Sequence, residues 1–324
     1  MTETHLPPTL RLSEPHDLLG AIPYLLEYHP TDSLVFLLLS GRRLVVTARL
    51  ALTPQETPTG TAIAHFLDHV AAEHGADGIV LVAYHADHEW AGDHVLEIVC
   101  GLERLAVLAA LVADGCHWWP GVCGHEPWET CDCDRGRPYD VTTSVAAAHA
   151  VWAGITAMPS RQALADSVAG PVDQRERAAA AAAMEAALTE ICDLTLAARR
   201  ERITQLIDRH CAGEELSGSE HAQLAVLVYE GAIRDVAVAR IEEPDAHLHV
   251  TLWRRVVAVT VAPFESAPLC LLGLAAWVGG NGALQVVCME RAERINPDYS
   301  LLQILDEINA QALAPAAWET LRAA

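Results

Sequence analysis

The sequence predicts a mixed α/β domain at the amino end of the chain, followed by a mainly α-helical domain. Short apolar runs separated by turn residues, which are typical of strands, occur almost only before residue 140. Alanine-rich segments with helical spacing follow that point. Because 324 residues exceed the usual size of one domain, we expect a mixed-sheet domain over residues 1–140 and a helical domain over residues 141–324.

The first expected elements are a helix and a β-hairpin. Apolar residues recur at helical spacing over residues 17–28, just after the start signal Glu14-Pro15. The apolar run at residues 33–39 and the alternating pattern at residues 44–52 predict two strands, with a turn over residues 40–43 between them.

An α/β unit is expected next. Residues 62–74 form an amphipathic pattern that Gly75 ends, and the wholly apolar run at residues 78–84 is typical of a buried strand. The remaining elements expected in this domain are a helix at residues 93–101 and strands at residues 104–113 and 116–119, joined by the turn Asp114-Gly115. The sheet should therefore contain five or six strands.

The second domain is expected to consist of helices. The predicted helices span residues 146–157, 174–211, 216–241, 246–259, 265–278, 282–294, 299–311 and 315–322. Residues 266–289 carry no charge and could be mistaken for a membrane span, but Gly279-Gly280-Asn281-Gly282 interrupts them. We therefore predict two buried helices joined by a turn at this position.

The amino-acid composition argues against several classes of function. All 21 basic residues are arginine, which excludes a Schiff-base lysine and a Walker-type phosphate lysine. The net charge of −22 disfavours direct binding to nucleic acid or to an anionic membrane. The first residues show no basic segment followed by an apolar one, so we expect a cytoplasmic protein.

Cysteine and histidine gather between the two domains. The candidate metal ligands are Cys116, Cys123, His125, Cys131 and Cys133. Tetrahedral zinc needs four such ligands, but the spacing does not match the usual pair of C-x-x-C motifs. The odd total of nine cysteines argues against a complete set of disulfides within one chain. Two interpretations stay open: a zinc ion that clips the loop, and free thiols.

Polar residues follow the strand predicted at residues 78–84. His85, Asp87 and His88 could act as a base and its orienting group, or as metal ligands. Ligands of open α/β sheets gather at the carboxyl ends of strands, so this is the preferred position for a pocket. The alternative is a solvated loop without a function.

Two other groups have structural interpretations. Residues 29–33 contain a histidine, an aspartate and a serine, but five neighbouring residues rarely form a catalytic triad. Because they precede a strand, we place them at the less favoured end of the sheet and interpret them as a turn. Arg234 and Asp235 lie in an apolar helical pattern, which predicts a charged pair that latches helices or domains together.

With these residues in view, the chain resembles an uncharacterised actinobacterial family, the domain of unknown function 4192. The shared positions are Asp17-Leu18-Leu19, Pro23, Leu25-Leu26, His29-Pro30, Asp32-Ser33-Leu34-Val35, Tyr84, Trp118-Trp119, Cys123, Cys131, Gly136, Pro138, Pro159-Ser160-Arg161, Arg234-Asp235, Ala276-Trp277 and Pro297-Asp298-Tyr299-Ser300-Leu301. The family tends to show two adjacent cysteines where this chain has Cys131-Asp132-Cys133-Asp134, so the resemblance implies no identical metal site. It implies no activity either.

Three functional hypotheses follow. The first is an interaction or assembly protein, whose acidic surface and helical half bind a protein partner or a second copy of the chain. The second is a small-ligand binding protein or an enzyme that uses the strand-end loop at residues 85–89, with zinc from the loop at residues 123–133 as the one cofactor suggested. The third is a thiol or metal sensor built on the cysteine loop. No residue pattern names a reaction, so whether the protein is an enzyme stays open.

Overall fold

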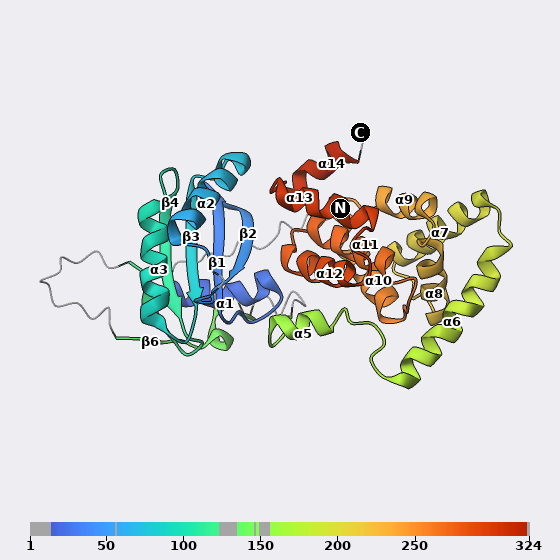
Figure 1. Ribbon diagram of the computed structural model, residues 1–324, viewed down its shortest axis with the longest axis horizontal. Coiled ribbons are helices and arrows are strands. Elements are labelled where there is room, and N and C mark those ends of the chain that lie inside the picture. Colours follow the sequence, from blue (N-terminus) through green and yellow to red (C-terminus); the bar gives the residue numbers. More distant parts are fainter. Residues whose placement is uncertain (1–13, 56, 123–134, 146, 149–155, 323–324) are drawn as a thin grey trace, which may run out of the picture. The chain divides into compact units, whose positions relative to one another are not determined.

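The computed structural model describes residues 14–55, 57–122, 135–145, 147–148 and 156–322. Two compact units divide the chain, residues 1–161 and residues 162–324, and Figure 1 shows the elements of each. The first unit contains a mixed sheet with helices and the second is helical. The predicted fold class is therefore confirmed.

A six-stranded sheet forms the centre of the first unit, in the order β2-β1-β3-β4-β5-β6. Its strands are β1 (Ser33–Ser40), β2 (Arg43–Ala51), β3 (Gly78–Tyr84), β4 (Ala106–Ala113), β5 (His117–Pro120) and β6 (Arg137–Pro138). Only the pairing of β3 with β4 is parallel among the described strands, and β1 runs antiparallel to both β2 and β3. β3 is buried along its whole length, as its apolar sequence predicts.

The helices of this unit are α1 (Pro15–Leu26), α2 (Gly60–His74), α3 (His88–Gly101) and the short 3₁₀ helix η2 (Val141–Thr143). α2 and α3 lie next to one another against the sheet (Figure 1). Their contact depends on glycine, because a Cβ on Gly60 would lie 2.7 Å from the Glu97 Cβ and a Cβ on Gly101 would lie 2.9 Å from the Ala64 Cβ. α3 begins five residues before the expected start at residue 93.

Residues after 140 remain with the first unit as far as Arg161. Met158 explains part of this grouping: its backbone N–H donates to the Glu27 carbonyl at 2.6 Å, and its carbonyl accepts from the His29 N–H at 3.0 Å. The helix expected at residues 146–157 lies largely outside the described residues. The predicted domain boundary near residue 140 stays a prediction, since compactness alone does not show which part folds independently.

The second unit is built from helices. They are α5 (Arg161–Asp166), α6 (Gln174–Cys192), α7 (Leu196–Cys211), α8 (Gly218–Leu227), α9 (Gly231–Ala239), η3 (Glu243–Asp245), α10 (Ala246–Ala258), α11 (Ser266–Val278), α12 (Gly282–Ile295), α13 (Ser300–Ala310), η4 (Pro315–Ala317) and α14 (Trp318–Leu321). Two expected helices are each divided in two, which corrects the prediction. Thr195 caps α7 by accepting the Ala198 N–H at 3.2 Å, and a turn at residues 228–230 separates α8 from α9.

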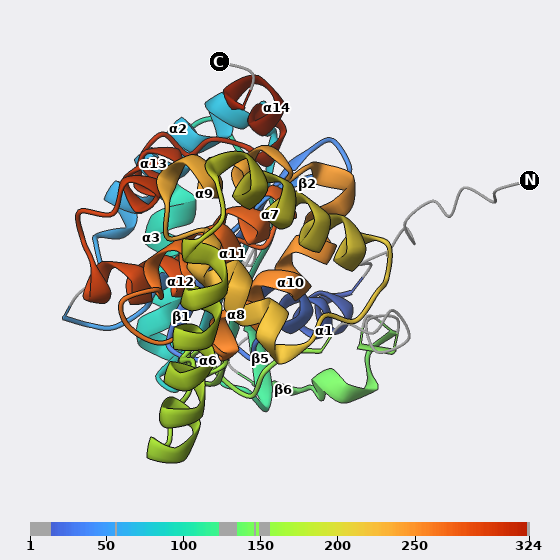
Figure 2. The same cartoon turned by 90° about the vertical axis from the view of Figure 1, so that its right-hand side faces the viewer.

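α11 is the most buried helix of the described chain, since all 13 of its residues are buried. α10 and α12 pack against it, and α13 and α9 add further contacts (Figure 2). The turn at residues 279–281 joins α11 to α12, as predicted for the uncharged segment. In the part of the chain that the structure describes, no helix has both the length and the apolar composition needed to cross a bilayer.

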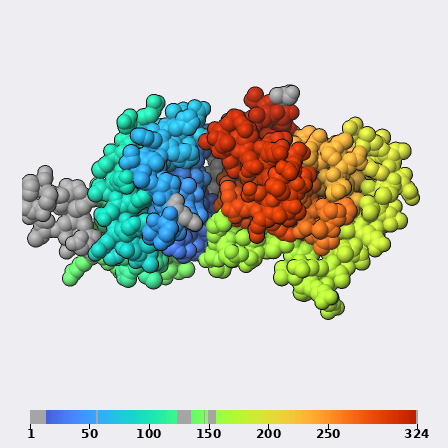
Figure 3. Space-filling view, in the orientation of Figure 1, coloured from blue at the N-terminus to red at the C-terminus, as the bar shows by residue number. Residues whose placement is uncertain are grey.

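α6 shows the opposite pattern, because most of its surface is exposed. Its buried residues are Ala180, Met184, Ala187 and Ile191. They recur at helical spacing and pack toward α8, while Ala178, Ala179, Ala181 and Ala182 are exposed. Figure 3 shows this helix in yellow-green at the surface of the helical unit.

Candidate functional site

The carboxyl end of β3 holds His85, one of the residues predicted for a strand-end site. The backbone N–H of His85 donates to the Ala113 carbonyl at 2.9 Å, which extends the parallel pairing of β3 with β4 by one residue. Both strands end at this edge of the sheet, and the chain then enters α3. His85 is thus held by the rigid core at an edge where open α/β sheets commonly bind ligands.

The amino end of β1 lies at the same edge, and this overturns the expectation for residues 29–33. β1 runs antiparallel to β3 and pairs Ser33 with Tyr84, so the start of one strand meets the end of the other. Asp32 therefore faces His85, with its Oδ1 atom 4.0 Å from the His85 Nε2 atom.

Ser33 has no free hydroxyl to act as a nucleophile. Its side chain is fully buried, and its Oγ donates to the Thr31 carbonyl at 2.6 Å and accepts from Arg49 Nε at 2.8 Å. These bonds hold the segment that leads into β1. Asp32 has a left-handed backbone with φ of 44°, as tight turns often require. Residues 29–32 form an irregular segment with a bend at Asp32, and a turn over residues 29–33 capped by Asp32 and Ser33 stays a prediction.

Hydrogen bonds to Asp87 orient the His85 ring. Its Nδ1 atom lies 3.0 Å from the Asp87 backbone N and 3.1 Å from the Asp87 backbone O. Nδ1 accepts the N–H when it carries a lone pair and donates to the carbonyl when it carries a proton. In either state Nε2 remains to face Asp32. A separation of 4.0 Å is too long for a direct hydrogen bond, so one bridging atom of a water or a ligand fits the geometry.

Asp87 and His88 have structural partners. Asp87 is the N-cap of α3, and its Oδ1 accepts the Trp90 N–H at 3.1 Å. The ring of His88 stacks on Trp119 of β5, with centroids 4.2 Å apart and planes 8° from parallel. Of the three residues predicted for this site, only His85 keeps a ring nitrogen directed toward a second charged group.

Aromatic residues that sequence reasoning missed surround the site. Trp90 lies against His85 with ring centroids 4.8 Å apart, and it also stacks with His94. Trp119 packs closely on the backbone, because a Cβ on Gly136 would lie 2.6 Å from the Trp119 ring. The buried Trp119 Nε1 and His94 Nε2 atoms have no hydrogen-bond partner among the described residues. A ligand or a water at this edge would satisfy them.

The titration behaviour of neighbouring groups leaves one carboxylate and two neutral phenols at this edge at neutral pH. Partial burial of Asp114 opposes its ionisation, but hydrogen bonds from the backbone N–H groups of His117 and Cys116 hold the pKa of its carboxyl below the ordinary value. Burial raises the pKa of Tyr84 well above 10 and that of Tyr139 to about 12. The carboxylate is therefore ionised while both phenols are neutral.

The predicted metal ligands fall mostly outside the described residues. Cys123, His125, Cys131 and Cys133 all lie in the segment 123–134. Cys116 is described and is an exposed free cysteine in the turn between β4 and β5. Within the described residues, no group of three or more histidine, cysteine, aspartate or glutamate side chains could hold a metal ion. The zinc interpretation of the loop stays a prediction.

Arg234 and Asp235 lie in α9, inside a helix as expected. The Arg234 side chain is 13% exposed and that of Asp235 is 66% exposed, so only the arginine is buried. Arg234 donates from Nη1 to Ser300 Oγ at 2.9 Å and to Tyr299 Oη at 3.3 Å, and its guanidinium lies over the Tyr299 ring. These contacts join α9 to the start of α13 through Arg234 alone, and a latch formed by the charged pair stays a prediction.

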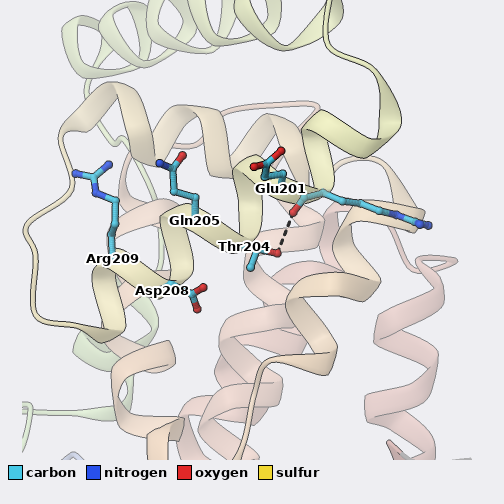
Figure 4. A pocket seen from close by; sticks show the side chains of 6 residues that line it. Glu201, Thr204, Gln205, Asp208 and Arg209 are labelled. Carbon is cyan, nitrogen blue, oxygen red and sulfur yellow. Dashed lines mark hydrogen bonds between the residues drawn. The ribbon is translucent and has the colours of Figure 1, made fainter.

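A shallow hollow with a volume of about 530 Å³ lies on α7 in the helical unit. Arg200, Glu201, Thr204, Gln205, Asp208 and Arg209 line it. Figure 4 shows that these side chains all come from one helix and that Thr204 bonds to the helix backbone. Asp208 is paired with Arg240, and Arg209 with Glu214 and Glu220. We interpret this hollow as the solvated face of α7.

Comparison with known families identifies the chain. The model of a family described as a domain of unknown function, DUF4192, matches residues 15–316. The chain belongs to this family. The DUF4192 match extends over most of both compact units, and it includes the strand-end residues and Arg234. No curated protein and no solved structure matches the chain.

Proposed function

We propose that this DUF4192 protein binds a small molecule at the carboxyl end of β3. The facing pair of His85 Nε2 and Asp32 Oδ1 carries the proposal, because its 4.0 Å separation leaves room for one ligand atom between a donor and a carboxylate. The two groups directly flank the paired strands β1 and β3, and the His85 side chain is mostly buried whereas that of Asp32 is exposed. Binding sites are commonly built in this way, from a few polar groups on a rigid scaffold.

The charge of the site limits the ligand. The ionised Asp114 carboxylate and the net charge of −22 disfavour phosphates and carboxylates, and the Arg49 guanidinium, which donates to the Asp32 carbonyl at 3.3 Å, is the positive charge beside the pair. The indole ring of Trp90 offers apolar contact beside His85, and aromatic faces attract cations. We therefore expect a neutral or cationic ligand, such as an amine or a guanidine, that donates hydrogen bonds to Asp32.

Ligand screening by NMR tests this proposal. A panel of amines, guanidines, neutral sugars and nucleotides should yield ligands that shift the signals of residues 32 and 85. Asp32→Asn and His85→Gln should each weaken binding at least tenfold, because each removes one of the two facing groups, an effect of about 1.4 kcal/mol. Asp87→Asn should have little effect, since asparagine also caps helices.

His65→Gln is the matched control, because His65 is an exposed residue of α2 in the same unit. Its affinity for the same ligands should stay within about twofold of the parent. Ligands that bind with equal affinity to all four variants would place the site elsewhere and contradict the proposal.

A hollow in the helical unit favours a second candidate function, the binding of a protein partner. Its volume is about 200 Å³ and its apolar lining includes Leu188, Val226, Leu227 and Phe264. At its border the exposed Tyr229 packs edge-on against Phe264, with ring centroids 5.1 Å apart. An apolar side chain of a partner, or of a second copy of the chain, would fit such a hollow.

Light scattering after size exclusion tests the second candidate. If the hollow mediates self-association, the parent should be an oligomer and Leu188→Glu should convert it to a monomer, because a buried unpaired charge costs several kcal/mol. Glu185→Gln, on the exposed face of the same helix, serves as the control. A parent that is a strict monomer and co-purifies with no partner would count against this function.

A further inference from the structure

Three helices of the second unit meet at a junction that buries one histidine from each. His210 lies in the last turn of α7, His221 in the first turn of α8 and His249 in α10. The three helices pack against one another in pairs. The residues are 7%, 7% and 1% exposed, respectively. Histidine is rarely buried so completely unless it is neutral or paired with an acid.

The hydrogen bonds of these rings suit the neutral form. His210 Nε2 lies 3.1 Å from the Leu248 carbonyl, and the His249 ring is bonded to the Arg240 carbonyl. The other nitrogen of each ring, Nδ1 in both cases, is buried and has no partner among the described residues; the same holds for His221 Nε2. A neutral imidazole leaves an unused lone pair there. A protonated ring would leave a buried, charged N–H without an acceptor, which is far more costly.

Some charged groups around the junction oppose protonation of the histidines, and others favour it. Arg255 of α10 lies close enough to His210 and His221 to oppose their protonation, and Arg240 does the same for His249. Glu220 of α8 favours protonation of His221, and Asp245 of η3 favours protonation of His249. Further out, Glu215 lies 3.8 Å from Arg255, and Glu242 interacts with Arg322 and His249.

Burial changes the pKa of every ring more than these charges do. It is the largest cause of the lowered pKa of His210 and His221, and it lowers the pKa of His249 to about 4. His210 also interacts with each of the other two rings, so one protonation makes the next harder.

We propose that the junction of α7, α8 and α10 is an acid-sensitive latch, closed while its three histidines are neutral and opened when the solvent becomes mildly acidic. This inference is independent of the strand-end ligand site, which lies in the other unit.

The sign of the pH dependence follows from proton binding. An exposed histidine binds a proton near pH 6.5, so between about pH 4 and pH 6.5 the open junction binds more protons than the closed one. The closed state is therefore fully favoured above pH 6.5 and loses stability as the pH falls below it. His249 alone should raise the opening constant about tenfold between pH 7.5 and pH 5.5.

Hydrogen exchange with mass spectrometry on the full chain tests the latch. After correction for the intrinsic effect of pH, peptides from α7, α8 and α10 should exchange at least tenfold faster at pH 5.5 than at pH 7.5. Peptides from α13 and from β3 should keep their protection. The range stops at pH 5.5 because most carboxylates titrate below it. Equal loss of protection in all helices, or none in α7, α8 and α10, would overturn the proposal.

Two further measurements separate the latch from a general acid effect. His249→Gln should flatten the pH response, whereas His117→Gln, which changes an exposed histidine of the first unit, should leave it intact. If His249→Gln does not fold, NMR titration of the unmodified protein still decides. Three histidines should then titrate below the ordinary value, His249 among them at about pH 4, and titration of all histidines near pH 6.5 would contradict the latch.

Discussion

Replacing Trp253 with alanine should lower the free energy of unfolding of the helical unit by about 3–5 kcal/mol. Trp253 belongs to α10, is fully buried and is the largest fully buried side chain of the described residues. Its removal leaves a cavity next to α11 that the surrounding helices can fill only in part. Urea unfolding followed by circular dichroism measures the change.

Phenylalanine provides the informative comparison. The Trp253 Nε1 atom has no hydrogen-bond partner among the described residues, whereas Trp318 Nε1 donates to the Ile241 carbonyl at 2.7 Å. Both rings are buried, so Trp253→Phe and Trp318→Phe remove similar volumes. Trp318→Phe should cost about 1–2 kcal/mol more, because it alone leaves a buried carbonyl unsatisfied. Equal losses would show that the Trp253 N–H has an acceptor in solution.

Replacing Arg291 with methionine should destabilise the same unit by about 3 kcal/mol. Arg291 of α12 donates from Nη2 to Glu265 Oε1 at 2.6 Å, just before α11 begins. The two side chains are 15% and 18% exposed, so methionine would leave a mostly buried carboxylate without its partner. This remaining contact with water places the expected loss at the low end of the range for buried pairs.

Arg294→Met is the matched control, because Arg294 is exposed on the same helix, and its cost should stay below about 0.5 kcal/mol. The double replacement of Glu265 and Arg291 by methionine should recover part of the stability, since neither charge is then left alone. A double variant as unstable as the sum of the single ones would show that the pair does not interact in solution.

Most strands could be predicted well because the sequence pattern that marks a strand lies within the strand itself. The run at residues 78–84 is apolar throughout and bounded by Gly78 and the polar His85, and β3 has these same bounds. The start of α3 was missed because residues 88–92 lack apolar periodicity. The available signal was Asp87, a residue type that caps helices, three positions before Trp90.

Helix breaks were harder to predict. Residues 174–211 keep a helical pattern throughout, and their alanines favour a helix at almost every position. The break comes from Thr195, whose side chain replaces a backbone acceptor at the start of α7. A single threonine in a strongly helical segment is a weak signal, because threonine also occurs inside helices.

The strand-end site could be predicted only in part. His85 follows its strand directly, so position along the chain was enough to propose it. Asp32 reaches the site from the start of β1, and its arrival depends on strand direction. The spacing between two strands does not determine whether they pair in parallel, since a helix can connect either arrangement. Residues 29–33 were for this reason placed at the wrong end of the sheet.

The complete burial of α11 has a consequence during protein synthesis. Its 13 residues leave the ribosome before α12 and α13, the helices that later pack against it. At ordinary rates of translation, the residues from the end of α11 to the end of α14 take roughly 2–8 s to appear. During those seconds an uncharged helix lacks part of its native cover, so its burial is complete only once α12 and α13 have been made.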